Sequence, residues 1–234
     1  MLVKSDAILL KKTPYADNSA ILHIYTRSHG MQSFIAQGMH GKSGKAAMLQ
    51  PGNLLELIFY FQSNKNLKRI KEMQLMQGFR GFDQNPVRLQ ILMFCLELSS
   101  KCLPEEQEDL HTFDFIRDQL LNLAEETELT WFPVQFLLKF AKINGLGLQL
   151  PIDGKKGFQL ETGTAIFRDT RMNPMQHLEE NEIMTCKVLE TGHIPQMTIE
   201  ERRTLTEKLL YYFKVHLFPE QELKSFPILM EVLG

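Results

Sequence analysis

The first eighty residues alternate between apolar and polar positions with the period of two that is typical of β-strands. In residues 53–62, for example, Leu55, Leu57, Phe59 and Phe61 all fall on one face. The strands that this pattern predicts are residues 7–11, 19–26, 31–37, 53–62 and 67–77. A small sheet has exposed edges unless it closes, so the pattern predicts a five-stranded barrel. An OB-type barrel is the natural candidate, although an SH3-like barrel has similar strand spacing and periodicity does not separate the two.

From residue 85 onward, apolar side chains recur every three or four residues, which is typical of amphipathic helices. Asn85-Pro86 combines a capping residue with a proline at the first helical position, and residues 198–201 form a capping box. The expected helices begin near residues 86, 104, 131, 179 and 198. The helical pattern breaks at residues 148–178, where glycines and prolines surround two short β-like pieces.

Charge divides the chain at about the same point as the secondary structure. Residues 1–80 contain 11 of the 26 Lys and Arg residues but only four acids, a net charge of +7, whereas residues 81–234 carry −9. The total of −2 hides this division. A small basic barrel joined to an acidic helical body favours a module that contacts nucleic acid and a body that contacts proteins or only packs.

Pattern and charge together predict an α+β fold, with an N-terminal five-stranded OB-type barrel followed by an α-helical domain that carries a small insert. The expected divisions are an OB-fold nucleic-acid-binding domain at 1–80, the first part of the helical domain at 81–147, the insert at 148–178, and the second part of the helical domain with a C-terminal tail at 179–234.

Two clusters of bases in the predicted barrel are candidate phosphate contacts. The glycine-containing loop at residues 38–45 allows close backbone approach, and His40, Lys42 and Lys45 lie within it. The last hairpin and other strand ends add Lys65, Lys68, Arg69, Lys71, Lys11, Lys12 and Arg27. The candidate base-stacking residues are Tyr15, Tyr25 and Phe34. A solvated loop, a solvated charged face and aromatic side chains buried in the core remain the alternatives.

Catalytic motifs do not stand out in the sequence. A nucleotide-binding P-loop at residues 38–45 would need glycine at position 36 or 39, where Ala36 and Met39 stand. Ser28 and His29 are adjacent, which places their side chains on opposite faces of any strand. Because the basic region also lacks an acidic cluster that could hold magnesium, we expect a protein that is not an enzyme.

The histidines and cysteines lack the spacing of metal ligands, so we expect neither a metal nor a cofactor. Cys95, Cys102 and Cys186 are odd in number and widely spaced, which favours a reducing cytosol over a disulfide framework. No apolar run approaches the roughly 18 residues of a membrane span, and the N-terminus lacks the apolar core of a signal peptide. These features predict a cytoplasmic protein.

Several short stretches together resemble one family. They are Ala7–Lys12, Ile24-Tyr25-Thr26-Arg27-Ser28-His29-Gly30, Ile35-Ala36-Gln37-Gly38, Leu49-Gln50-Pro51-Gly52 and Leu223-Lys224-Ser225. In these stretches, and in the order of basic barrel, interrupted helical domain and short tail, the chain resembles the RecO family of bacterial recombination mediators. The resemblance covers nearly the whole chain and is strongest in the first 60 residues.

The resemblance implies an OB fold that binds single- and double-stranded DNA, anneals complementary strands, and helps to load recombinase onto strands coated by single-strand-binding protein. It also implies RecR and the C-terminal tail of the single-strand-binding protein as partners, RecA as an indirect one, and association with the nucleoid. The family's basic loop falls on Lys42 and Lys45, with His40 where the family often has arginine.

One departure from the family concerns zinc. Many members place zinc-binding cysteines in the insert after the third helix, but residues 148–178 contain no cysteine. The resemblance therefore implies a degenerate zinc-ribbon-like insert without zinc ligands. Phe158 and Phe167 must then hold its hairpin by packing.

The resulting expectation is a mediator of DNA repair and homologous recombination whose electrostatic binding falls steeply with salt. Two alternatives come from other classes. An RNA-binding OB-fold protein would prefer structured RNA to single-stranded DNA, and a protein scaffold would have no nucleic-acid affinity near physiological salt.

Overall fold

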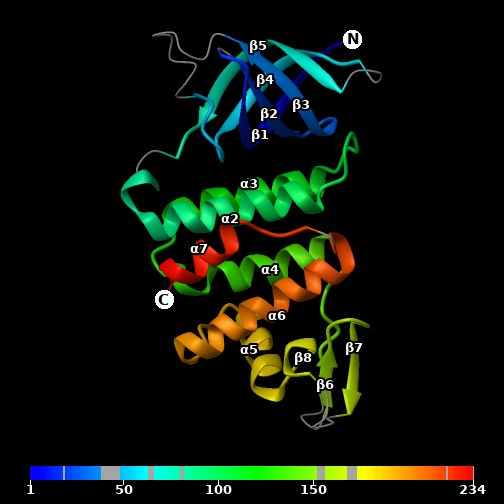
Figure 1. The fold of residues 1–234 in the computed structure, drawn as a ribbon, viewed down its shortest axis with the longest axis vertical. Helices are drawn as coiled ribbons and strands as arrows, with labels where there is room; N and C mark the ends of the chain where they lie inside the picture. The colour runs from blue at the N-terminus through cyan, green and yellow to red at the C-terminus, as the bar shows by residue number, and fades with distance from the viewer. Residues whose placement is uncertain are drawn as a thin grey trace. The chain divides into compact units, whose positions relative to one another are not determined.

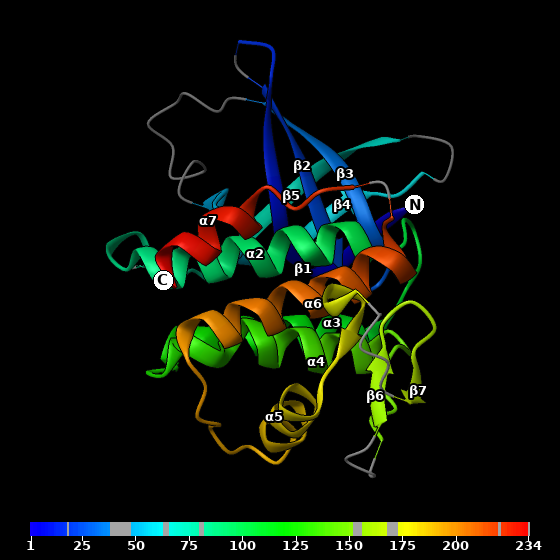
Figure 2. The same cartoon turned by 60° about the horizontal axis from the view of Figure 1, so that its bottom comes forward.

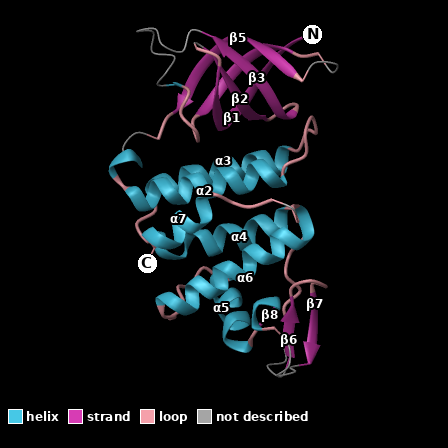
Figure 3. Cartoon of the chain, in the orientation of Figure 1, coloured by secondary structure: helices cyan, strands magenta, loops and turns pink. Residues whose placement is uncertain are grey.

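The structure, a computed structural model, describes residues 1–17, 19–37, 48–62, 66–79, 82–151, 156–167, 173–219 and 221–233. The chain forms two compact units, Met1–Glu126 and Thr127–Gly234. The first unit contains a β-barrel and two long helices, and the second contains further helices and a small sheet (Figure 1, Figure 3). Each unit has its own fold.

The first unit begins with a closed barrel of strand order β1-β2-β3-β5-β4. The strands are β1 (Leu2–Tyr15), β2 (Ser19–Thr26), β3 (Gly30–Gln37), β4 (Leu54–Tyr60) and β5 (Leu67–Gln77). β1 pairs antiparallel with both β2 and β4, and a short parallel pairing of β3 with β5 completes the closure. The expected OB-type barrel is confirmed. β1 begins earlier than predicted because Leu2 to Ile8 pair with β4.

Alternate side chains of the strands fill the barrel. Leu22, Phe34, Leu57 and Phe59 are fully buried, and the rings of Phe34 and Phe59 meet edge to face with their centroids 5.1 Å apart. Burial of such large apolar side chains is the main source of stability for a small domain. Phe34 therefore belongs to the core, and the expectation that it stacks on a nucleic-acid base is wrong.

Two helices, α2 (Pro86–Cys102) and α3 (Leu110–Glu125), complete the first unit. They follow a short 3-10 turn, η1 (Phe82–Gln84), and α2 packs on β1 (Figure 2). As predicted, Asn85 caps α2, accepting a hydrogen bond from the Arg88 amide at 3.0 Å. The cap removes an unsatisfied donor from the first turn.

The loop at residues 103–109 differs from the sequence expectation, which began the second helix at Pro104. This loop docks on the barrel: the Glu106 amide donates to the Met31 carbonyl at 3.2 Å. Gly30 lies so close to the loop that a Cβ there would stand 2.1 Å from the Gln107 carbonyl oxygen. Because docking gives Glu106 a positive φ of 56°, the helix starts only after Asp109.

A Gly30→Ala variant tests this docking. Gly30 has a φ of 63° and no room for a Cβ, whereas Gly145 has a φ of 73° and nothing within 4 Å. We expect Gly30→Ala to lower the free energy of unfolding by about 2–4 kcal/mol, since backbone strain and overlap with the loop add. Gly145→Ala pays only the backbone term of about 1 kcal/mol. Urea denaturation measures both, and equal losses would contradict a rigidly docked loop.

The second unit is mainly helical. Its elements are η2 (Leu129–Trp131), α4 (Phe132–Ile143), β6 (Lys156–Gln159), β7 (Thr164–Phe167), η3 (Pro174–Gln176), β8 (His177–Leu178), α5 (Glu180–Glu190), α6 (Ile199–Leu217) and α7 (Ser225–Val232). α4 and α6 meet through the stacked rings of Phe140 and Phe213, with centroids 5.9 Å apart. α5 joins α6 through the buried pair of Glu182 and Lys208 at 2.7 Å. The predicted capping box at Thr198 is confirmed.

The C-terminal tail folds within this unit as α7. Leu229 is fully buried, and the Arg202 guanidinium donates to the Leu233 carbonyl at 3.1 Å. Arg202 also lies over the Trp131 ring, 5.8 Å from its centroid. The apolar residues near the end of the sequence are therefore part of the folded unit.

The insert forms a three-stranded sheet of order β7-β6-β8. Phe158 is fully buried and meets the Tyr212 ring at a centroid distance of 6.3 Å. Phe167 is 79% exposed, so it does not anchor the hairpin as expected. Of the two phenylalanines expected to hold the hairpin, only Phe158 is buried, and it packs against α6.

Alanine substitutions separate these two phenylalanines. We expect Phe158→Ala to lower the free energy of unfolding of the second unit by about 3–5 kcal/mol, because it leaves a cavity in a closed core. Phe167→Ala, on the same hairpin, should change it by less than about 1 kcal/mol. Thermal unfolding followed by circular dichroism distinguishes the two outcomes. A large loss for Phe167→Ala would contradict the exposed position of that ring.

Candidate nucleic-acid interface

The outward side of the barrel presents three rows of side chains across neighbouring strands. Residues opposite one another in register point to the same side of a sheet. The rows are Lys11, His23, Ser33 and Leu67; then Thr13, Ile21, Ile35 and Arg69; then Tyr15, Ser19 and Gln37. We call these eleven residues the open face. It spans β1, β2, β3 and β5.

The open face has the chemistry of a surface for single strands. It contains no acid, and Lys11, Arg69 and Tyr15 are exposed, the last by 50%. Ile21 and Ile35 form a partly buried apolar centre between them. Lysine and arginine bind phosphates, while aromatic and apolar side chains contact bases without regard to sequence. An extended strand could satisfy both kinds of contact here.

His23 lies in the first row. Its Nδ1 is 3.2 Å from the Ser33 hydroxyl oxygen, which belongs to the next strand. Partial burial lowers the pKa of His23, and Lys11 lowers it further, while Glu105 opposes this shift. The imidazole therefore tends to be neutral beside a lysine that is charged.

A fourth row, Ile8, Tyr25 and Met31, continues the outward side but is covered. Tyr25 is only 1% exposed: its ring lies 5.7 Å from that of Phe113 on α3, and its hydroxyl donates to the Asp109 carbonyl at 3.2 Å. Burial is also the main reason that the pKa of Tyr25 is raised. The expectation that Tyr25 stacks on a base is wrong, since a helix occupies that surface.

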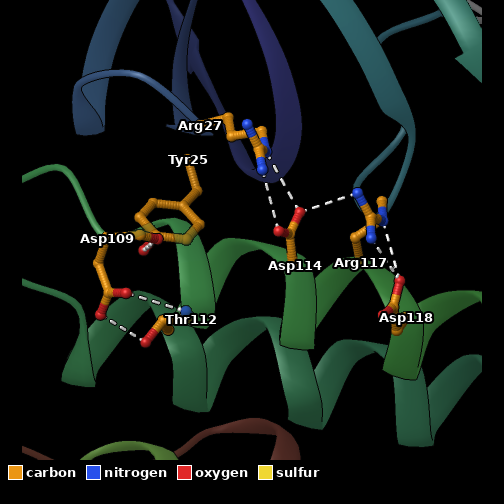
Figure 4. A network of polar contacts seen from close by, with 7 residues as sticks. All are labelled: Tyr25, Arg27, Asp109, Thr112, Asp114, Arg117 and Asp118. Atoms are coloured by element: carbon orange, nitrogen blue, oxygen red, sulfur yellow. Dashed lines mark hydrogen bonds and ion pairs between the residues drawn. The ribbon is translucent and has the colours of Figure 1, made fainter.

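Two of the predicted phosphate contacts are bound by acids of the first unit. Lys68 is 3% exposed, with its Nζ 2.6 Å from Glu106 and 5.5 Å from the Phe61 ring centroid. Arg27 makes a bidentate contact with Asp114, with hydrogen bonds of 3.2 and 3.0 Å (Figure 4). Lys68 is thus closed to a phosphate, and the geometry gives both residues an anchoring role.

The other predicted contacts fall in different places. Lys12 belongs to an inward row beside Leu22, and Lys71 is exposed with Glu72 at 3.3 Å. Where β3 and β5 part after Ile35 and Arg69, Lys71 also lines a cavity of about 460 Å³. His40, Lys42, Lys45 and Lys65 lie outside the described residues. Of the thirteen predicted site residues, Lys11, Arg69 and Tyr15 come together on the open face.

Sequence reasoning missed Ile21, His23 and Ile35 as members of the site. The signal was present, because Ile21 and His23 alternate with the core residues Leu22 and Ile24 along β2. This alternation predicts that Ile21 and His23 lie on the outward side of the strand.

The acidic residues are concentrated beneath the barrel. Residues 81–126 contain three bases and ten acids, a net charge of −7, whereas residues 127–234 carry only −2. The barrel's +7 and this segment's −7 belong to the same compact unit, which is neutral overall. The division of charge seen in the sequence is therefore largely a feature of the first unit.

Ser28 and His29 lie in the turn between β2 and β3, where the structure corrects the expectation that they face apart. The Ser28 hydroxyl oxygen is 2.8 Å from His29 Nδ1. The imidazole packs on Phe61 with ring centroids 4.3 Å apart, so this contact orders the turn.

Within the described ranges, no group of three or more His, Cys, Asp or Glu side chains is placed to hold a metal ion. Burial raises the pKa of the Cys102 and Cys186 thiols to about 12. Both are therefore neutral and unreactive near neutral pH. In the same part of the chain, no helix is both long and apolar enough to cross a membrane.

Two models of one protein family match the barrel and the helices that follow it. The model "Recombination protein O N terminal" matches residues 1–79, and "Recombination protein O C terminal" matches residues 83–225. The chain belongs to the RecO family. The family's N-terminal model corresponds to the OB-type barrel, and its C-terminal model begins just before α2.

RecO-family relatives match over the full length. The DNA repair protein RecO of Phocaeicola vulgatus is 28% identical over 242 residues, with 100% of both chains covered. That of Bacteroides fragilis is 27% identical over 243 residues, covering 99% of each, and that of Christiangramia forsetii is 23% identical over 241 residues, covering 100% of each. The chain is a RecO-family DNA repair protein.

The Arg27–Asp114 contact makes a pH-dependent contribution to stability. The hydrogen bond from Arg27 is the main reason that the pKa of Asp114 lies below its ordinary value. A lowered pKa in the folded state stabilises the fold above the unfolded pKa, and this contribution is lost as pH falls through the folded one. We expect Asp114→Asn to be less stable than wild type at neutral pH and equal to it in strong acid.

Urea midpoints across a pH series measure this difference. Asp118→Asn is the matched control, because Asp118 pairs with Arg117 on its own helix. If both variants behaved alike, the contact between α3 and the barrel would contribute nothing to stability.

Proposed function

We propose that this RecO-family protein is a non-enzymatic mediator of DNA repair and recombination, and that its open face holds single-stranded DNA. The observation that carries the proposal is the open face itself, where exposed Lys11, Arg69 and Tyr15 flank an apolar centre and no acid intervenes. The DNA phosphates would pair with Lys11 and Arg69. The nucleobases would lie against Tyr15, Ile21 and Ile35.

Strand annealing follows from this mode of binding. A surface that neutralises phosphates while leaving base edges uncovered reduces the repulsion between two complementary strands. Double-stranded DNA would bind the same basic residues through its phosphates alone. Its affinity would therefore depend mainly on salt concentration. The proposal also keeps Lys42, Lys45 and His40 as phosphate contacts, since they follow β3 closely in the sequence.

Family membership supports a wider role. We propose that the protein helps to load recombinase onto strands coated by single-strand-binding protein, with RecR and the acidic-apolar tail of that protein as direct partners and RecA as an indirect one. The acidity of residues 81–126 argues for DNA on the opposite, basic side of the first unit.

Charge reversal on the open face tests the proposal. We expect Lys11→Glu with Arg69→Glu to weaken binding of a labelled single-stranded oligonucleotide by roughly tenfold or more near 0.1 M salt. Each lost phosphate contact should also reduce the slope of log affinity against log salt by about 1. Fluorescence anisotropy across a salt series measures both quantities, and renaturation of complementary oligonucleotides measures annealing.

The matched control is Lys139→Glu with Lys142→Glu, which makes the same change of charge at two exposed positions of α4. The proposal fails if both double variants lose affinity equally, or if the wild type binds no DNA. Preference for structured RNA in the same assay would favour an RNA-binding protein, and absence of any nucleic-acid affinity would favour a scaffold.

A further inference from the structure

His23 is the one histidine on the open face, where it is partly buried. It lies between Lys11 on β1 and Ser33 on β3, in the first row of the open face. One ring nitrogen, Nδ1, is 3.2 Å from the Ser33 hydroxyl oxygen. Among the described residues, the other nitrogen, Nε2, has no hydrogen-bond partner.

The charged groups around His23 come from two elements. Lys11 on β1 disfavours a positive imidazole, and Glu105 in the loop before α3 favours one. Ser33 on β3 is neutral and can accept a hydrogen bond from a protonated Nδ1. Burial acts in the same direction as Lys11, so the free protein holds the neutral ring.

We propose that His23 is a phosphate contact of the open face that takes up a proton when a nucleic-acid backbone binds. In the bound state Nδ1–H donates to the Ser33 hydroxyl oxygen and Nε2–H donates to a phosphate oxygen. The phosphate adds a negative charge to that of Glu105, and it offsets the repulsion from Lys11. This inference rests on the proposed function and adds to it a residue and a pH dependence.

The direction of the pH effect follows from linkage. A phosphate raises the pKa of the imidazole above its value in the free protein, so binding and protonation favour each other. The gain in affinity is complete below the pKa of the free protein and is lost as pH rises through the pKa of the complex. Affinity for DNA should therefore increase on acidification through the range in which histidines titrate.

The experiment compares single-stranded oligonucleotide binding at about pH 8 and pH 6 at constant ionic strength. We expect the wild-type affinity to increase about three- to tenfold on acidification, consistent with uptake of up to one proton. His23→Gln keeps a polar side chain beside Ser33 without a titratable ring, and should lose most of this pH dependence. His193→Gln is the matched control, because His193 is an exposed histidine of the second unit that is not among the candidate contacts.

A second readout is independent of affinity. In a nuclear magnetic resonance titration, the pKa of the His23 ring should rise when the oligonucleotide is added, whereas the ring signals of exposed His193 in the second unit should not respond to the oligonucleotide. Isothermal titration calorimetry in buffers of different ionisation enthalpy should show proton uptake that His23→Gln abolishes.

Failure of the inference and failure of the proposed function give different results. If the wild type binds DNA without a pH effect, or if His23→Gln keeps the same pH effect as His193→Gln, the role of His23 is refuted and DNA binding stands. If the wild type binds no DNA at either pH, the proposed function is refuted and the role of His23 with it.

Discussion

Docking of the acidic segment 103–118 against the basic barrel is the contact on which the first unit depends. It has a backbone part, in which Glu106 and Gln107 approach Met31 and Gly30, and a charged part, in which Glu106 and Asp114 bind Lys68 and Arg27. The backbone part requires a glycine at one position, which fixes the register of the loop on the barrel. The charged part pairs a buried lysine with a carboxylate, which offsets the cost of burying its charge.

The same docking decides which part of the barrel is available for function. It covers the row that contains Tyr25 and stops before the row that contains His23, so the open face begins where the helices end. It also removes two bases from the pool that could bind phosphates. What remains is a smaller basic surface, opposed by ten acids in the same unit. A neutral but strongly polarised unit orients a polyanion toward one side without attracting it to the other.

The elements themselves could be predicted because local signals determine them. The alternation of apolar and polar residues predicted all five strands. Capping residues predicted the starts of α2 and α6, because a Ser, Thr, Asp or Asn side chain caps a helix within three residues of its own position. Site residues behaved differently. The partner of Tyr25 is Phe113 and that of Arg27 is Asp114, each almost ninety residues later in the chain. Local periodicity does not predict such long-range contacts. The sequence therefore could not show which basic and aromatic residues of the strands are exposed and which are covered.

The insert is a small sheet that a neighbouring helix stabilises. A small sheet of three short strands buries too little surface to be stable alone, which is why such elements commonly use a metal or a larger neighbour. Here Phe158 and Leu178 are fully buried, and Tyr212 of α6 supplies the ring against which Phe158 packs. The sheet is therefore stabilised from outside, by a helix, rather than from within. The packing of this sheet depends on α6, and the exposed ring of Phe167 is not part of its buried core.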